Sequence, residues 1–151
     1  SRLFINVREK RGLAYYVKAG GSGYHDTGTL AAAAGLDLKR IDEAIDVILA
    51  EFVQIAKTRV SEKELKKAKE YIKGGAALSW EDSRTVAFSY GVDELFEGRI
   101  RSQEEFLREI DNVRAEDIQR VAQFLVTNSK LNLAVIGPFK DQARFEKILK
   151  V

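Results

Sequence analysis

The order of the periodic segments constrains the fold of this chain more than any other feature of its sequence. Residues 15–36 have the pattern of two β arms joined by a turn, and residues 131–136 alternate as a single late strand. Most residues between these two regions show helical spacing. The sequence therefore predicts an α+β fold, with helices packed on one face of a small antiparallel sheet. This sheet is thin for so many helices, so either a partner supplies extra strands or the chain lacks its own N-terminal strands.

The start of the chain predicts a helix that leads into the hairpin. Residues 2–11 read as a short helix, and Gly12 is suited to end it. β-like sequence follows from Tyr15, and the segment His25–Gly28 has turn chemistry. The small side chains of both arms allow another backbone to approach closely.

Apolar spacing and capping residues predict the helices. The clearest helix carries one apolar stripe, formed by Ile41, Ile45, Ile48, Phe52 and Ile55. The other signals are capping boxes at 61–64 and 102–105, a break at 79–84, a stop at Gly98, and apolar spacing around 118–125 and 145–149.

Composition excludes several classes of function. Lys and Arg number 25 and Asp and Glu 23, so the net charge of +2 predicts no nucleic-acid partner. The chain has no Cys and one His, which excludes disulfides, thiolate metal sites and any two-His metal motif within it. No apolar run approaches the roughly 18 residues of a membrane span, so we predict no membrane partner. The lack of Cys is compatible with the cytoplasm, where we expect the protein to act.

Four local features have ordinary structural explanations. His25 lies in a predicted turn and is most simply a surface residue, and residues 20–23 lack the Lys-Ser/Thr ending of a phosphate loop. The acidic stretch 93–117 has the helical phase of a solvated face. The basic segment 57–73 has the spacing of a salt-bridged helix surface, and no interleaved aromatic residues favour nucleic-acid binding.

The strongest local signal is the pair Arg8 and Tyr15. If the helix continued past Gly12 they would share a face, whereas a bend at Gly12 would place Tyr15 at the start of the strand. In either case a guanidinium with forked donors and a phenol with one O–H donor could meet at one ligand, such as a peptide carbonyl. The residues alone favour a surface Arg and a half-buried Tyr beside a hairpin, because any junction of a helix and a strand can have this pattern.

The block Arg8 to Tyr15, with Ser1 to Phe4 before it, closely resembles a known protein family. It resembles the C-terminal, non-zinc half-domain of the pitrilysin, insulin-degrading enzyme and mitochondrial processing peptidase family of inverzincin zinc metallopeptidases. The resemblance extends weakly along the rest of the chain, through Tyr24–Gly28, Ser61–Lys69, Val113–Leu125 and Ile136-Gly137.

The resemblance implies a clamshell of two homologous halves around a peptide substrate. The opposing half would hold zinc and the Glu that acts as general base, either on the same polypeptide or as a separate subunit. This chain has no His-x-x-Glu-His, so it would bind no catalytic zinc and would be inactive alone. Its Arg8 and Tyr15 would contact the peptide carbonyl and steady the tetrahedral intermediate, and the hairpin could offer a strand edge to extended peptide.

The resemblance also implies that residues 1–151 form a single truncated half-domain. Family members have strands and a helix before the Ser-Arg-Leu-Phe block, which agrees with the thin sheet. We therefore expect a fragment whose open sheet edge favours self-association. Asn6 and Tyr16 depart from the residues common in the family, but neither belongs to the Arg/Tyr pair.

Two other functions remain open at this stage. The chain could be a structural or assembly domain of the same family that has lost catalysis, although an intact Arg8 and Tyr15 argue against this. More distantly, it could be a basic helical module that binds nucleic acid, which salt-titrated binding would test.

Overall fold

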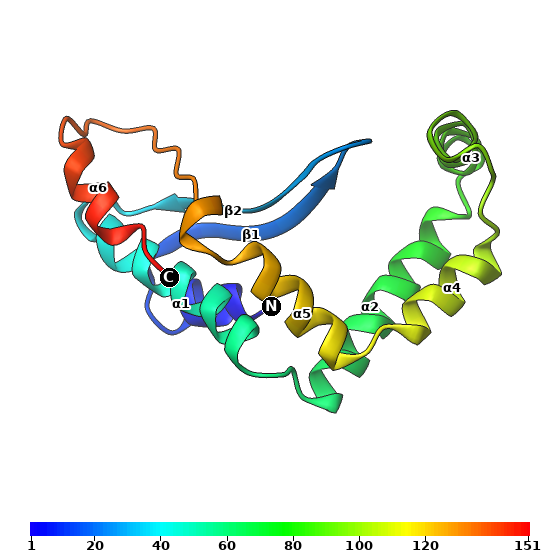
Figure 1. The fold of residues 1–151 in the computed structure, drawn as a ribbon, viewed down its shortest axis with the longest axis horizontal. Helices are drawn as coiled ribbons and strands as arrows, with labels where there is room; N and C mark the ends of the chain where they lie inside the picture. The colour runs from blue at the N-terminus through cyan, green and yellow to red at the C-terminus, as the bar shows by residue number, and fades with distance from the viewer. The chain divides into compact units, whose positions relative to one another are not determined.

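The computed structural model describes residues 1–151 and divides them into two compact units (Figure 1). The first unit comprises residues 1–58 and 119–151, and the second comprises residues 59–118. The elements combine helices with one antiparallel sheet, which confirms the predicted α+β class. None of the helices combines the length and the apolar character needed to cross a membrane.

The predicted N-terminal helix is present and takes a π form, η1 (Phe4–Glu9). Its wide turn is visible in the bond from the Lys10 N–H to the Ile5 carbonyl at 2.9 Å. Gly12 ends the helical region with φ of +61°, a left-handed conformation that glycine adopts without steric cost. The chain then leaves the helix as a strand, so the bend at Gly12 is confirmed.

The predicted hairpin is confirmed as β1 (Ala14–Gly23) and β2 (Gly28–Leu36). Its regular register runs from Gly23 opposite Gly28 to Tyr16 opposite Gly35. The register then shifts, because Ala14 lies opposite Leu36 and Tyr15 is left as an extra residue. This β-bulge at Tyr15 changes the direction of the side chains at the start of β1.

One helix joins both hydrophobic clusters of the first unit. A short 3₁₀ turn, η2 (Leu38–Arg40), leads into α1 (Ile41–Lys57), whose apolar stripe was predicted. Ala44 of α1 packs in a cluster with η1 and the hairpin, whose other buried members are Leu3, Val7, Leu13, Ala14 and Val17. Ile41, Ile45 and Leu49 of α1 form the second cluster with the C-terminal segment. Helices therefore cover one face of the hairpin.

The strand predicted at residues 131–136 is wrong. This segment follows a 3₁₀ turn, η3 (Asn128–Lys130), and precedes α6 (Gln142–Ile148), but it pairs with no strand. Leu131 and Val135 pack against the second cluster, as the alternation suggested. No backbone hydrogen bond joins the segment to another, because no neighbouring strand lies beside it to complete a ladder.

The second unit consists of helices whose boundaries match the predicted caps. They are α2 (Glu62–Ser79), α3 (Ser83–Glu97), α4 (Gln103–Asn112) and the first turn of α5 (Ala115–Leu125). Ser61 and Asp82 cap the N-termini of α2 and α3 with their side chains, and Gly98 ends α3 with φ of +66°. Ser102 and Glu105 form the complete capping box that the sequence predicted.

A lysine pair joins α2 to the end of α4. The Lys69 ammonium donates to the Asp111 carbonyl at 2.7 Å, and the Lys73 ammonium donates to the Asp111 carboxylate at 2.9 Å. The hydrogen bond that Lys73 donates to the Asp111 carboxylate raises the pKa of Lys73 above its ordinary value. The basic segment 57–73 thus contributes to an ion-paired helix surface, as the charge spacing suggested.

Candidate functional site

Arg8 lies in η1 with its side chain exposed to solvent. Its guanidinium lies over the Phe4 ring, one turn earlier, with 5.1 Å between the guanidinium carbon and the ring centroid. No carboxylate or carbonyl of the chain accepts a hydrogen bond from this guanidinium. Its planar set of donors is therefore available to a bound molecule.

Tyr15 is the extra residue of the bulge at the start of β1, and 78% of it is exposed. Without a bulge, alternation would turn one of two successive residues toward the core. Here Ala14 and Val17 are buried, while Tyr15 and Tyr16 are both exposed. The bulge thus presents the Tyr15 phenol to solvent on a paired, backbone-bonded strand.

Tyr16 is placed by the glycine opposite it. A Cβ atom added at Gly35 would lie 2.6 Å from Cε1 of Tyr16, so the ring occupies the space of the missing side chain. The ring of Tyr16 is therefore held against β2 at Gly35.

The turn between Arg8 and Tyr15 is held by several hydrogen bonds. The Gly12 N–H donates to the Arg8 carbonyl at 3.0 Å, and the Leu13 N–H donates to the Val7 carbonyl at 2.9 Å. These bonds satisfy carbonyls that the end of η1 would otherwise leave unpaired. The backbone on both sides of Gly12 is therefore fixed relative to the helix.

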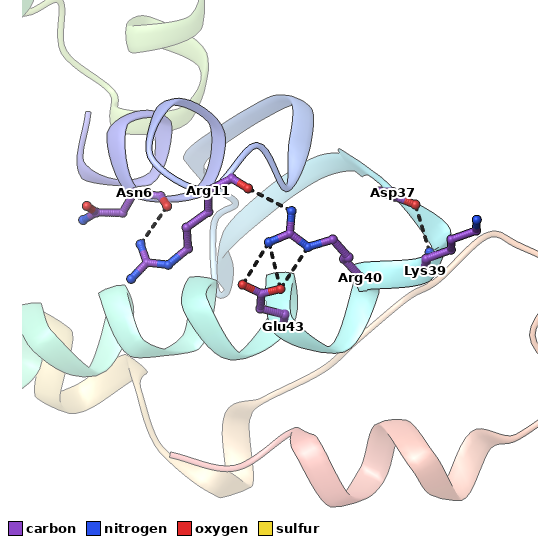
Figure 2. A network of polar contacts seen from close by, with 6 residues as sticks. All are labelled: Asn6, Arg11, Asp37, Lys39, Arg40 and Glu43. Atoms are coloured by element: carbon purple, nitrogen blue, oxygen red, sulfur yellow. Dashed lines mark hydrogen bonds and ion pairs between the residues drawn. The ribbon is translucent and has the colours of Figure 1, made fainter.

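Arg40 ties this turn to the start of α1 (Figure 2). Its guanidinium donates to the Arg11 carbonyl at 3.0 Å and to both carboxylate oxygens of Glu43 at 3.0 and 3.1 Å. The Arg11 guanidinium in turn donates to the Asn6 carbonyl at 2.8 Å. Arg11 and Arg40 therefore use donors within the fold, in contrast to Arg8.

The Asn6 side chain adds a second link to α1. Its amide donates to the Glu51 carboxylate at 2.6 Å, in a partly buried position. With the Arg40 contacts, this bond anchors η1 and the following turn at separate points along α1. Asn6 thus has a structural role beside the site.

The two predicted site residues lie on either side of one braced turn and neither is buried in the core. No hydrogen bond joins their side chains, so each is free to contact a third group. Their shared contact with a peptide remains a prediction.

The residues of this chain do not fit a zinc site. No group of three or more His, Cys, Asp and Glu side chains could hold a metal ion. The one histidine, His25, is exposed in the loop between β1 and β2. The chain therefore lacks the ligand set from which a catalytic zinc centre is built.

Sequence reasoning missed three parts of this site. Phe4 beneath Arg8 could have been found from the four-residue spacing, which brings side chains together on a helix. No local sequence pattern predicts the bulge at Tyr15 or the hydrogen bond from Arg40 to the Arg11 carbonyl. Both depend on contacts between segments that are distant in the sequence.

The structure is thus an α+β domain in which an exposed guanidinium and an exposed phenol lie on either side of the turn at Gly12, and in which no cluster of side chains could hold a metal ion. Residues 1–72 match the family model described as "Peptidase M16 inactive domain". The chain belongs to this peptidase family, as a C-terminal half-domain of the non-zinc kind.

Curated relatives support this assignment, and a solved structure shares the fold. An uncharacterized zinc protease of Mycobacterium leprae is 32% identical over 151 residues, which is 100% of this chain and 34% of the relative. The alpha subunit of the mitochondrial-processing peptidase of Rattus norvegicus is 28% identical over 98% of this chain and 28% of that protein. A chain in the structure of complex III2 from Candida albicans with Inz-5 bound has the same fold, with a TM-score of 0.78 and 19% identity. That match covers 99% of this chain and 36% of the other.

The chain thus spans about a third of the length of the proteins it matches.

Proposed function

We propose that this chain is the substrate-binding, non-zinc half of a zinc metalloendopeptidase, and that Arg8 and Tyr15 contact the peptide at the cleaved bond. One observation carries the proposal. An unpaired guanidinium and an exposed phenol lie on either side of a turn that is braced against α1. The names of the relatives, which include zinc proteases, support a role in proteolysis.

The chemistry of the two side chains suits a developing negative charge on a peptide carbonyl. Arg8 offers charged donors in a rigid fork, and Tyr15 offers one O–H donor. Donors that are already in position stabilise an oxyanion without reorganisation during the reaction. Zinc and the activation of water would belong to a homologous zinc-bearing half, and the role proposed here is confined to binding and charge stabilisation.

The test requires the longer protein, or the complex with the zinc-bearing half, and a cleavable peptide. Arg8→Ala and Tyr15→Phe should each lower kcat/KM by about 10²-fold, the scale of losing one oxyanion donor. Matched controls are Arg84→Ala and Tyr71→Phe, which alter exposed residues of the second unit. Rates within twofold of the unmodified protein for both site variants would refute the proposal.

The same assay separates the enzyme from the structural alternative. A non-catalytic assembly domain predicts no peptide cleavage by the whole protein in the presence of zinc, together with normal assembly of the Arg8→Ala variant. The proposal predicts cleavage by the whole protein and none by the 151-residue chain alone, because this chain lacks a metal-holding cluster.

A further inference from the structure

Phe4 is the only side chain that contacts the guanidinium of Arg8 as a defined interaction. We infer that Phe4 is a positioning residue, which holds the Arg8 guanidinium ready for the substrate. The inference rests on the proposed function of Arg8 and adds a residue to which that function assigns no role.

The type of contact matters because it leaves the donors of Arg8 free. A guanidinium carries its N–H groups in the plane, whereas an aromatic ring attracts the cation through its face. Contact with a ring therefore restrains the side chain and consumes no donor. A carboxylate in the same position would restrain Arg8 equally well, but it would compete with the peptide carbonyl.

The neighbouring arginines show the contrast. Arg40 donates to Glu43 and to the Arg11 carbonyl, and Arg11 donates to the Asn6 carbonyl. Both are therefore engaged in holding the fold. Arg8 is the arginine of this region that has an aromatic partner in place of an acceptor.

Phe4 is itself well anchored. Its N–H donates to the Ser1 hydroxyl oxygen at 3.2 Å, and it lies between Leu3 in sequence and the buried Val7 one turn on. The burial of Leu3 and Val7 fixes the rotation of η1, so the Phe4 ring stays on the side of the helix that carries Arg8. The ring is 36% exposed, which leaves a surface on which the guanidinium can rest.

The kinetic test is a double-mutant cycle in the whole protein. Phe4→Leu keeps an apolar side chain and removes the ring, and it should lower kcat/KM by about two- to fivefold, the factor that an exposed cation–π contact accounts for. Phe4→Tyr keeps the ring and should retain the rate. In the Arg8→Ala background, Phe4→Leu should have no further effect, since the two residues act as one unit.

A matched control exists in the same unit. The Lys130 ammonium lies 3.2 Å from the centroid of the exposed Phe124 ring, so Phe124→Leu removes another cation–π pair away from Arg8. This variant should leave kcat/KM unchanged. A loss as large as that of Phe4→Leu would show a general effect on the fold and would overturn the inference.

A second measurement is independent of activity. In NMR spectra of the 151-residue chain, the Arg8 side-chain protons near the Phe4 ring should show an upfield ring-current shift, which Phe4→Leu abolishes. If Arg8→Ala leaves the peptidase rate unchanged, the proposed function itself fails. If Arg8→Ala slows cleavage while Phe4→Leu changes neither the rate nor the NMR shift, only the role of Phe4 is overturned.

Discussion

At the scale of single residues, Gly12 decides how Arg8 and Tyr15 are presented. Its φ of +61° is left-handed, and a Cβ atom there would meet nothing within 4 Å, so only backbone strain opposes a side chain. Gly12→Ala should therefore lower the free energy of unfolding by about 1–2 kcal/mol. Gly12→Asn should cost less, because Asn tolerates this conformation better. Urea unfolding of the three proteins would measure the difference.

Gly98 provides the control for this prediction. It has φ of +66° at the end of α3, and a Cβ atom there also meets nothing. Gly98→Ala should destabilise by a similar amount, but only Gly12→Ala should also weaken peptide cleavage by the whole protein. A Gly12→Ala variant as stable as the unmodified chain would show that the turn at Gly12 is not the constraint described here.

The candidate site also shows how far residue-level reasoning reaches. Arg8 and Tyr15 were found from a motif of eight contiguous residues and from the donors that their side chains carry. Gly12 was found because a helix that ends before a strand needs a left-handed residue. Arg40 was not found, because its contact with the Arg11 carbonyl joins residues 29 positions apart and exists only after α1 packs on the turn.

At the scale of elements, the N-terminus of α3 depends on one carboxylate. Asp82 accepts from the Thr85 hydroxyl at 2.6 Å and from the Arg84 N–H at 3.2 Å. The Thr85 bond, followed by the Arg84 bond, holds the pKa of Asp82 below its ordinary value of 3.8. A lowered pKa contributes stability above the unfolded pKa, and this contribution is lost as the pH falls through the folded value.

We therefore expect α3 to fray at its N-terminus as the pH falls from the ordinary value of 3.8 through the lower pKa of Asp82 in the folded protein, where the cap becomes protonated. Amide hydrogen exchange in the first turn of α3, followed by NMR over this pH range, would measure the loss. Asp82→Asn keeps a capping oxygen that does not titrate, so its first turn should show no such step. An identical step in the Asn variant would assign the fraying to another group.

The elements that were predicted well are those whose signals are local. Helix starts at Ser61 and Ser102 depend on residues within one turn, and both side chains cap as predicted. The break predicted over residues 79–84 contains the third cap, Asp82. The segment 131–136 failed for the opposite reason. Its alternation correctly placed Leu131 and Val135 against the core, but a strand also requires a neighbouring strand, which no local pattern supplies.

At the scale of the whole molecule, one strand edge and one helix face with exposed apolar side chains are open to association. β2 pairs with β1 along one edge only, and none of its nine residues is charged, so nothing protects its other edge. In the second unit, α3 buries no residue, and Phe88 and Leu95 are 74% and 76% exposed on one side of it. The sequence predicted the open sheet edge, whereas the exposed face of α3 emerged only from the structure.

We expect the 151-residue chain to self-associate through β2, giving a mass by light scattering that rises with concentration above 17.0 kDa. The Tyr24 N–H donates to the Thr27 carbonyl, and antiparallel pairs alternate, so the Leu30 N–H should point away from β1. Leu30→Pro then removes a donor from the open edge, keeps the bonds to β1, and should shift the chain toward monomer.

The α3 face supplies the competing explanation and the control. Phe88→Ser together with Leu95→Ser removes the exposed apolar side chains and leaves the sheet edge intact. If β2 mediates association, this double variant should have the same mass as the unmodified chain, because strand pairing needs backbone donors and not the side chains of α3. A monomeric double variant combined with an unchanged Leu30→Pro chain would assign the association to α3. A monomer at high concentration without any substitution would contradict association by either surface.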